Sequence, residues 1–173
     1  MERKRDNGFT LIELLIVVAI ISIIAAIAVP GLLRARMTAN ETSALTALKV
    51  TSTSQVGYSA SCGNGAYAAT YLILGTPPAG STDGFISADL GGSATPQKSG
   101  YGYSLGPGAG SAAAPNDCNG TATITAYYAT ATPLTFGTTG TRSFTVNQGN
   151  VVWQLIAATA PTEPFGPPAG PAQ

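Results

Sequence analysis

An apolar run near the N-terminus limits what this chain can fold into. The residues from Leu14 to Val29 form a stretch of 16 in which Ser22 is the only polar side chain. With its flanks, from Phe9 to Leu33, the segment reaches the roughly 20 residues that a helix needs to cross a bilayer. The preceding residues, MERKRDNG, are basic, which favours a cytoplasmic N-terminus with the following chain outside. A membrane-anchored chain is therefore the first expectation.

A carboxylate, Glu13, stands directly before this run. A charge at the centre of a bilayer costs about 2.5–3.5 kcal/mol on insertion scales, so ionisable residues in a span usually have a function and a partner. The first cation after the leader is Arg34, about a membrane thickness further along a helix. The partner of Glu13 must therefore come from elsewhere.

The composition argues against an enzyme and against a nucleic-acid-binding protein. The chain has 8 basic and 8 acidic residues and no histidine, which removes the commonest general base and metal ligand. No basic cluster lies outside the N-terminus, so the charge pattern of a nucleic-acid-binding surface is missing. A nucleophile motif and paired acids at useful spacing are also missing. We expect a non-enzymatic protein with no cofactor, no metal and no direct nucleic-acid partner.

The residues Gly8-Phe9-Thr10-Leu11-Ile12-Glu13 closely resemble the type IV prepilin motif, which is shared by type IV pilins and the pseudopilins of type II secretion. The resemblance implies cleavage by a prepilin peptidase between Gly8 and Phe9, followed by N-methylation of the new Phe9 amine. It also places Glu13 at the glutamate position that the family uses in subunit assembly.

Cleavage would place an ammonium on Phe9, four positions before Glu13. Along a helix this separation is about 6 Å, and the two residues share a face. The pair can form within one subunit, or Glu13 can meet the Phe9 amine of a neighbouring subunit. In either case a desolvated charge seeks its opposite strongly, and the pairing would set the register of assembly. The sequence leaves both pairings open.

Two structures are compatible with the Val29-Pro30-Gly31 step. The first helix can end there, because proline removes a helical hydrogen bond at a cost of about 3 kcal/mol. Apolar residues nevertheless continue at helical spacing between polar ones, as in an amphipathic helix; they are Leu32, Leu33, Met37, Ala44, Leu45 and Leu48. In the family, proline at the matching place marks a kink. We therefore predict one long helix from Phe9 to about Ser59, kinked at Pro30 and Gly31. Just beyond the span, Arg34 and Arg36 are expected to be solvated or paired with Glu41.

The second half of the chain is rich in strand signals. Predicted strands cover 99–105, 121–131, 142–148 and 151–155, the last two joined by a Gly149-Asn150 turn. An antiparallel sheet with one face against the amphipathic helix follows. The predicted fold class is α+β, a long kinked helix on a small β-sheet head, as in type IV pilins. Its parts are a leader (1–8), the helix (9–59), the head (60–159) and a Pro-rich flexible tail (160–173).

Cys62 and Cys118 are the only cysteines, 56 positions apart. An outward-facing domain sees an oxidising compartment, where we expect this pair to form a disulfide. Two Asn-x-Thr sequences, at Asn40 and Asn119, match the N-glycosylation pattern, which is short and therefore weak evidence.

The resemblance implies a structural subunit that polymerises through its N-terminal helix into a type IV pilus or related filament, serving adhesion, motility or DNA uptake. The alternative is a pseudopilin of a type II secretion system, which helps to export folded proteins. Expected partners are other pilin subunits, the prepilin peptidase, an inner-membrane assembly platform and, before assembly, membrane lipid. The expected location is the bacterial inner membrane for the precursor and a surface or periplasmic filament afterwards.

Overall fold

The computed structural model describes residues 9–172 and divides into two units, Met1–Arg36 and Met37–Gln173. The predicted cleavage residue Gly8 lies outside the described part. Helix α1 (Leu11–Ser61) belongs to both units and continues through Pro30 and Gly31. The alternative in which the first helix ends at Pro30 is therefore wrong. In the turn that follows the helix, Asn64 (φ 51°) and Gly65 (φ +85°) both adopt the left-handed conformation.

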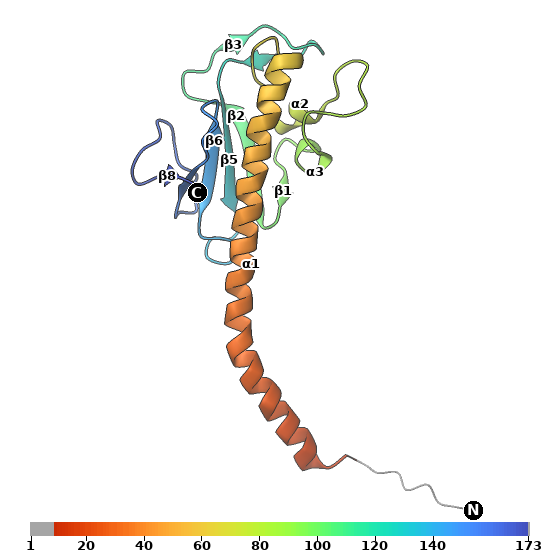
Figure 1. Ribbon diagram of the computed structural model, residues 1–173, viewed down its shortest axis with the longest axis vertical. Helices are drawn as coiled ribbons and strands as arrows, with labels where there is room; N and C mark the ends of the chain where they lie inside the picture. The colour runs from red at the N-terminus through yellow and green to blue at the C-terminus, as the bar shows by residue number, and fades with distance from the viewer. Residues whose placement is uncertain (1–8, 173) are drawn as a thin grey trace, which may run out of the picture. The chain divides into compact units, whose positions relative to one another are not determined.

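The second half of α1 forms one side of the core of the head (Figure 1). Its buried residues recur at helical spacing and include small and polar side chains: they are Ala44, Ala47, Leu48, Thr51, Ser52, Ser54, Gln55 and Tyr58. The buried polar groups have partners. The Gln55 side chain donates to the Ala68 carbonyl at 2.8 Å and accepts from the Ala68 amide at 2.9 Å. The helix is thereby fixed to the following loop.

The head contains a six-stranded antiparallel sheet in the order β1-β2-β5-β6-β7-β8. The strands are β1 (Gln97–Lys98), β2 (Tyr101–Pro107), β5 (Tyr127–Pro133), β6 (Ser143–Asn147), β7 (Trp153–Leu155) and β8 (Gly170–Pro171). Alternate residues of β2 and β5 are buried, as expected for a sheet with one covered face. Large residues face small ones across the pair, since Tyr103 lies opposite Ala131. The predicted α+β class, a long helix on an antiparallel sheet, is confirmed.

Short elements occupy segments that the sequence indicated as links and loops. They are α2 (Tyr71–Gly75), α3 (Ala88–Gly91) and β3 (Ala113–Ala114). Strand β3 pairs with β4 (Thr123–Ile124) in a separate two-stranded sheet. The strand predicted over 121–131 is therefore divided between β4 and β5. The two short helices approach at Gly75 and Gly91. A Cβ atom added to Gly75 would lie 2.3 Å from the Gly91 carbonyl oxygen. The lack of a side chain at these glycines allows the two backbones to come this close. The sequence indicates glycines in this region only as turn formers.

The Pro-rich C-terminal segment differs from the predicted flexible tail, because it packs on the sheet. Strand β8 pairs with β7, and the Ala172 amide donates to the Val152 carbonyl at 2.7 Å. The Phe165 ring stacks on Trp153 and on Tyr128, with ring centroids 5.3 and 6.4 Å away. Phe165, which lies among the prolines, gives the segment apolar surface to bury. The prediction of a flexible tail rested on the proline content and did not take this ring into account.

Candidate functional site

The N-terminal part of α1 is exposed along its whole length. Every residue from Phe9 to Leu33 is exposed, including the aliphatic ones. Helix α1 is long and apolar enough to cross a membrane by length and composition. The hydroxyl of Ser22 donates back to the Val18 carbonyl at 2.7 Å, so the one polar side chain of the run is satisfied within the helix. None of the apolar window of this helix is buried among the described residues.

Glu13 forms a capping box with Thr10 at the start of α1. The Glu13 carboxylate accepts hydrogen bonds from the Thr10 amide at 2.9 Å and from the Thr10 hydroxyl at 2.6 Å. In return, the Glu13 amide donates to the Thr10 hydroxyl oxygen at 3.3 Å. The motif Thr-x-x-Glu before an apolar run is the sequence pattern of such a cap, and sequence reasoning missed it. Both bonds from Thr10 go to one carboxylate oxygen, Oε2. The other oxygen, Oε1, can therefore accept from a cation.

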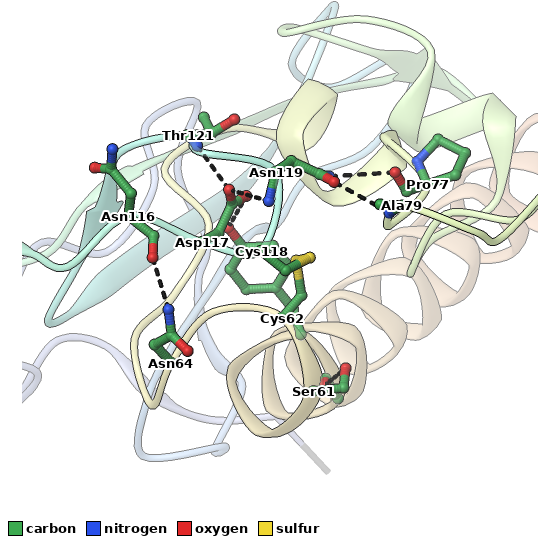
Figure 2. The surroundings of a disulfide bond; sticks show 12 residues. Ser61, Cys62, Asn64, Pro77, Ala79, Asn116, Asp117, Cys118, Asn119 and Thr121 are labelled. Atoms are coloured by element: carbon green, nitrogen blue, oxygen red, sulfur yellow. Dashed lines mark hydrogen bonds between the residues drawn. A yellow bond between two sulfur atoms is a disulfide. The ribbon is translucent and has the colours of Figure 1, made fainter.

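The Cys62–Cys118 disulfide joins the end of α1 to the loop before β4 (Figure 2). The two Cα atoms are 4.8 Å apart, and the Cys118 amide donates to the Cys62 carbonyl at 2.8 Å. Nearby, the Asn64 side chain donates to the Asn116 carbonyl at 2.7 Å. The predicted disulfide is confirmed. Closing a chain segment of this length contributes about 4 kcal/mol in the loop-entropy account.

Asp117 organises the loop next to the disulfide (Figure 2). Although it is buried, its carboxylate accepts from the amides of Asn119 at 2.9 Å and Thr121 at 2.7 Å. The hydroxyl of Tyr58, on α1, donates to the same carboxylate at 2.7 Å. Burial and the neighbouring Asp117 raise the pKa of Tyr58 above its ordinary value. Asn119 and Thr121 are close to Asp117 in the chain, but Tyr58 is 59 positions away, and no local pattern predicts that contact.

The two Asn-x-Thr patterns carry structural hydrogen bonds. The Asn119 amide group donates to the Pro77 carbonyl at 3.2 Å, and its oxygen accepts from the Ala79 amide at 3.2 Å. The Asn40 side chain donates to the Thr139 carbonyl at 3.0 Å. Each asparagine therefore holds a loop of the head, and a glycan would be attached at the same Nδ2 atom that donates to the carbonyl.

Glu41 links α1 to the β5–β6 loop. Its carboxylate accepts from the amide and hydroxyl of Thr141 at 2.7 and 2.9 Å, and it lies 3.5 Å from the Arg142 guanidinium. The sequence suggested Arg34 or Arg36 as its cation. The cation beside Glu41 is instead Arg142, because the sheet brings this residue back to the helix. The neighbouring Thr141, which also bonds to Glu41, is 100 positions away from it in the chain.

The residues 3–29 match the family model described as the prokaryotic N-terminal methylation motif. In this N-terminal segment the chain resembles type IV pilins. It is similar to the type IV wide pilus major component PilA4 of Thermus thermophilus, with 62% identity over 39 residues, 22% of this chain and 30% of that protein. It is also similar to the type IV major pilin protein PilA of Myxococcus xanthus, with 48% identity over 54 residues, 31% of this chain and 24% of that protein. No solved structure matches.

These matches cover less than a third of either curated relative. The comparisons therefore concern the N-terminal segment and not the whole head. Among residues 9–172, no group of three or more His, Cys, Asp or Glu side chains could hold a metal ion.

Proposed function

We propose that the chain is a structural subunit that polymerises through the first half of α1 into a type IV pilus or a related filament. The observation that carries the proposal is the exposed apolar helix whose N-terminal cap contains Glu13. Such a helix has two suitable environments, a bilayer or a bundle of the same helices. A subunit stored in the inner membrane and then moved into a filament uses both in turn.

The pairing of Glu13 with a Phe9 amine belongs to this proposal. After cleavage between Gly8 and Phe9, the methylated amine would be a cation that no other residue near the start of α1 supplies. Oε2 of Glu13 is occupied by Thr10, which leaves Oε1 to meet an amine of the same or a neighbouring subunit. Proline and glycine, at positions 30 and 31, would let the helix bend as subunits pack, since proline leaves one carbonyl without its helical donor.

The proposal includes the partners that this route needs. A prepilin peptidase would cut and methylate the precursor, and an inner-membrane platform would add the subunit to a growing filament. A pseudopilin of type II secretion would share the same helix, peptidase and membrane stage. The two functions separate in the genes beside this one: a retraction ATPase and a pilus secretin support the pilus, and a general secretion apparatus supports the pseudopilin.

The test uses two substitutions that distinguish charge from capping. Glu13→Gln keeps an acceptor for Thr10 but removes the charge, whereas Glu13→Ala removes both. We expect both variants to lose filaments by electron microscopy while their precursors accumulate in the membrane. Wild-type filament yield from Glu13→Ala would refute assembly by charge pairing, and wild-type yield from Glu13→Gln alone would assign the effect to the cap. Mass spectrometry of mature subunits should find a methylated Phe9 at the N-terminus; any other terminus contradicts the processing route.

A further inference from the structure

Two charged side chains of the head, Lys49 and Asp83, have no charged partner. The other charged side chains of the head are held in place: Glu41 by Arg142, Asp89 by Lys98, Asp117 by Tyr58, and Glu163 by Asn147 and the Ala109 amide. Within residues 37–172, the Lys49 side chain makes no hydrogen bond or ion pair, and the Asp83 carboxylate accepts only from the neighbouring Thr82 hydroxyl at 3.3 Å. The two charges that the head leaves over are therefore of opposite sign.

Lys49 lies in a groove between α1 and the turn that joins β6 to β7. The groove has a volume of about 560 Å³, and its lining includes Val56, Val151, Val152 and Ala172. Val56 is 49% exposed and Val151 is 47% exposed, so apolar surface stands open beside the cation. A groove of this size can hold a few side chains of a partner. We call it the Lys49 groove.

Asp83 lies in the exposed loop between α2 and α3. Residues 79–83 are all exposed, and the loop extends away from α1 (Figure 1). The Asn119 side chain holds the base of this loop, because it donates to the Pro77 carbonyl and accepts from the Ala79 amide, each at 3.2 Å (Figure 2). A loop that is already held loses less conformational freedom when it binds, which favours a role in docking.

The loop and the Lys49 groove lie on opposite sides of the second half of α1. Helices α2 and α3 are on one side, and β8, which precedes the groove residue Ala172, is on the other (Figure 1). The loop therefore does not fill the groove of its own chain. A contact between two different faces of the same protein repeats from copy to copy and builds a ring or an open helical filament.

We propose that the loop of one copy docks in the Lys49 groove of the next copy, with Asp83 beside Lys49. A second copy is the occupant because, within residues 37–172, Asp83 is the one exposed carboxylate that no cation meets. The apolar side chains of the groove would be covered by the contact, and the charge pair would fix its direction and register. This inference rests on the filament of the proposed function, to which it adds a specific contact between heads.

The test reverses the two charges in the full-length chain, in a host whose own copy of the gene is replaced. Lys49→Glu makes the groove and the loop both negative, and Asp83→Lys makes both positive. We expect each variant alone to lose most of its filaments by electron microscopy, because like charges then face each other at every contact. The double variant K49E/D83K keeps the net charge of the wild type and should assemble. The two single variants expressed together should also assemble, since each loop finds an opposite charge in the other subunit.

Cross-linking within filaments gives a second measurement. Thr53 lines the Lys49 groove and Ser81 lies in the loop, so a chain with Thr53→Cys and Ser81→Cys should form a ladder of disulfide-linked subunits on mild oxidation. The matched control pairs Ser81→Cys with Thr46→Cys, because Thr46 is also exposed on α1 but lines a different groove, beside Leu90. A ladder in the control and none in the first chain would show that the loop docks elsewhere.

The remaining outcomes separate this inference from the proposed function. If the wild type and both single reversals form filaments in equal yield, the contact does not exist and the filament stands. If Lys49→Glu loses filaments and the added Asp83→Lys does not restore them, the groove has a different occupant. If the wild-type chain forms no filament, the proposed function is wrong and this contact with it. Near-ultraviolet circular dichroism of each purified variant checks that the head is folded.

Discussion

Thr10 and Glu13 bond to each other in both directions across the first turn of α1. The Thr10 amide and hydroxyl donate to the Glu13 carboxylate, and the Glu13 amide donates to the Thr10 hydroxyl oxygen. These bonds satisfy amides that a helix start leaves without partners, which matters most where water is scarce. A residue whose position suggests assembly also stabilises its own helix, so the two roles need separate tests.

Thr10→Val should weaken the cap and leave the charge of Glu13 in place. The substitution keeps the Thr10 amide but removes the hydroxyl, and loss of such a cap costs about 1 kcal/mol. Faster amide hydrogen exchange at Glu13 in the membrane-held precursor would report the loss. Thr10→Ser keeps the hydroxyl and should exchange like the wild type. Equal exchange in the valine and serine variants would show that the hydroxyl does not cap the helix.

Tyr58 and Tyr103 allow a buried hydroxyl with a hydrogen-bond partner to be compared with a buried hydroxyl that has none. Tyr58→Phe leaves the buried Asp117 carboxylate without one donor and should lower the free energy of unfolding by about 1–3 kcal/mol. Within residues 9–172, the Tyr103 hydroxyl is the one buried side-chain polar atom without a hydrogen-bond partner. Tyr103→Phe should therefore be neutral or stabilising. Denaturant unfolding of the two variants measures both values, and an equal loss in the two would contradict the Asp117 account.

Phe165→Ala should destabilise the head although the residue lies in the Pro-rich segment. The substitution removes a half-buried ring from between Trp153 and Tyr128, and we expect a loss of about 2 kcal/mol, below the value for a fully buried phenylalanine. Thermal unfolding followed by the Trp153 signal is the measurement. Thr162→Ala, at an exposed position of the same segment, is the control. A flexible tail would make the two variants equally stable.

The head should lose stability in strong alkali. Burial raises the pKa of Tyr103 and of Tyr127 to about 12, and it also raises the pKa of Tyr71 and Tyr101. Unfolded tyrosine titrates near about 10, so the folded state holds these protons more tightly. The contribution is complete below pH of about 10 and declines as pH rises toward about 12. Tm across this range should fall, less steeply in Tyr103→Phe, and a constant Tm would refute the prediction.

Several features of the fold follow from local sequence patterns. The amphipathic spacing after Gly31 predicted that the helix continues, and α1 does so to Ser61. The alternating strands and the Gly149-Asn150 turn predicted β6 and β7 close to where they lie, with Asn150 at φ 57°. The tail was predicted as flexible because prolines dominate its composition, yet one ring, Phe165, finds partners on β5 and β7 that no local pattern identifies.

By itself, the sequence determined the membrane-length apolar helix, the methylation motif at its start and the strand content of the head, because periodicity and short motifs act over neighbouring residues. It also indicated the Cys62–Cys118 disulfide, since only one pairing was available. The tertiary structure decided which distant groups meet: Tyr58 with Asp117, and Glu41 with Arg142. Those contacts join segments that are far apart in the chain, and only the order and register of the strands bring them together.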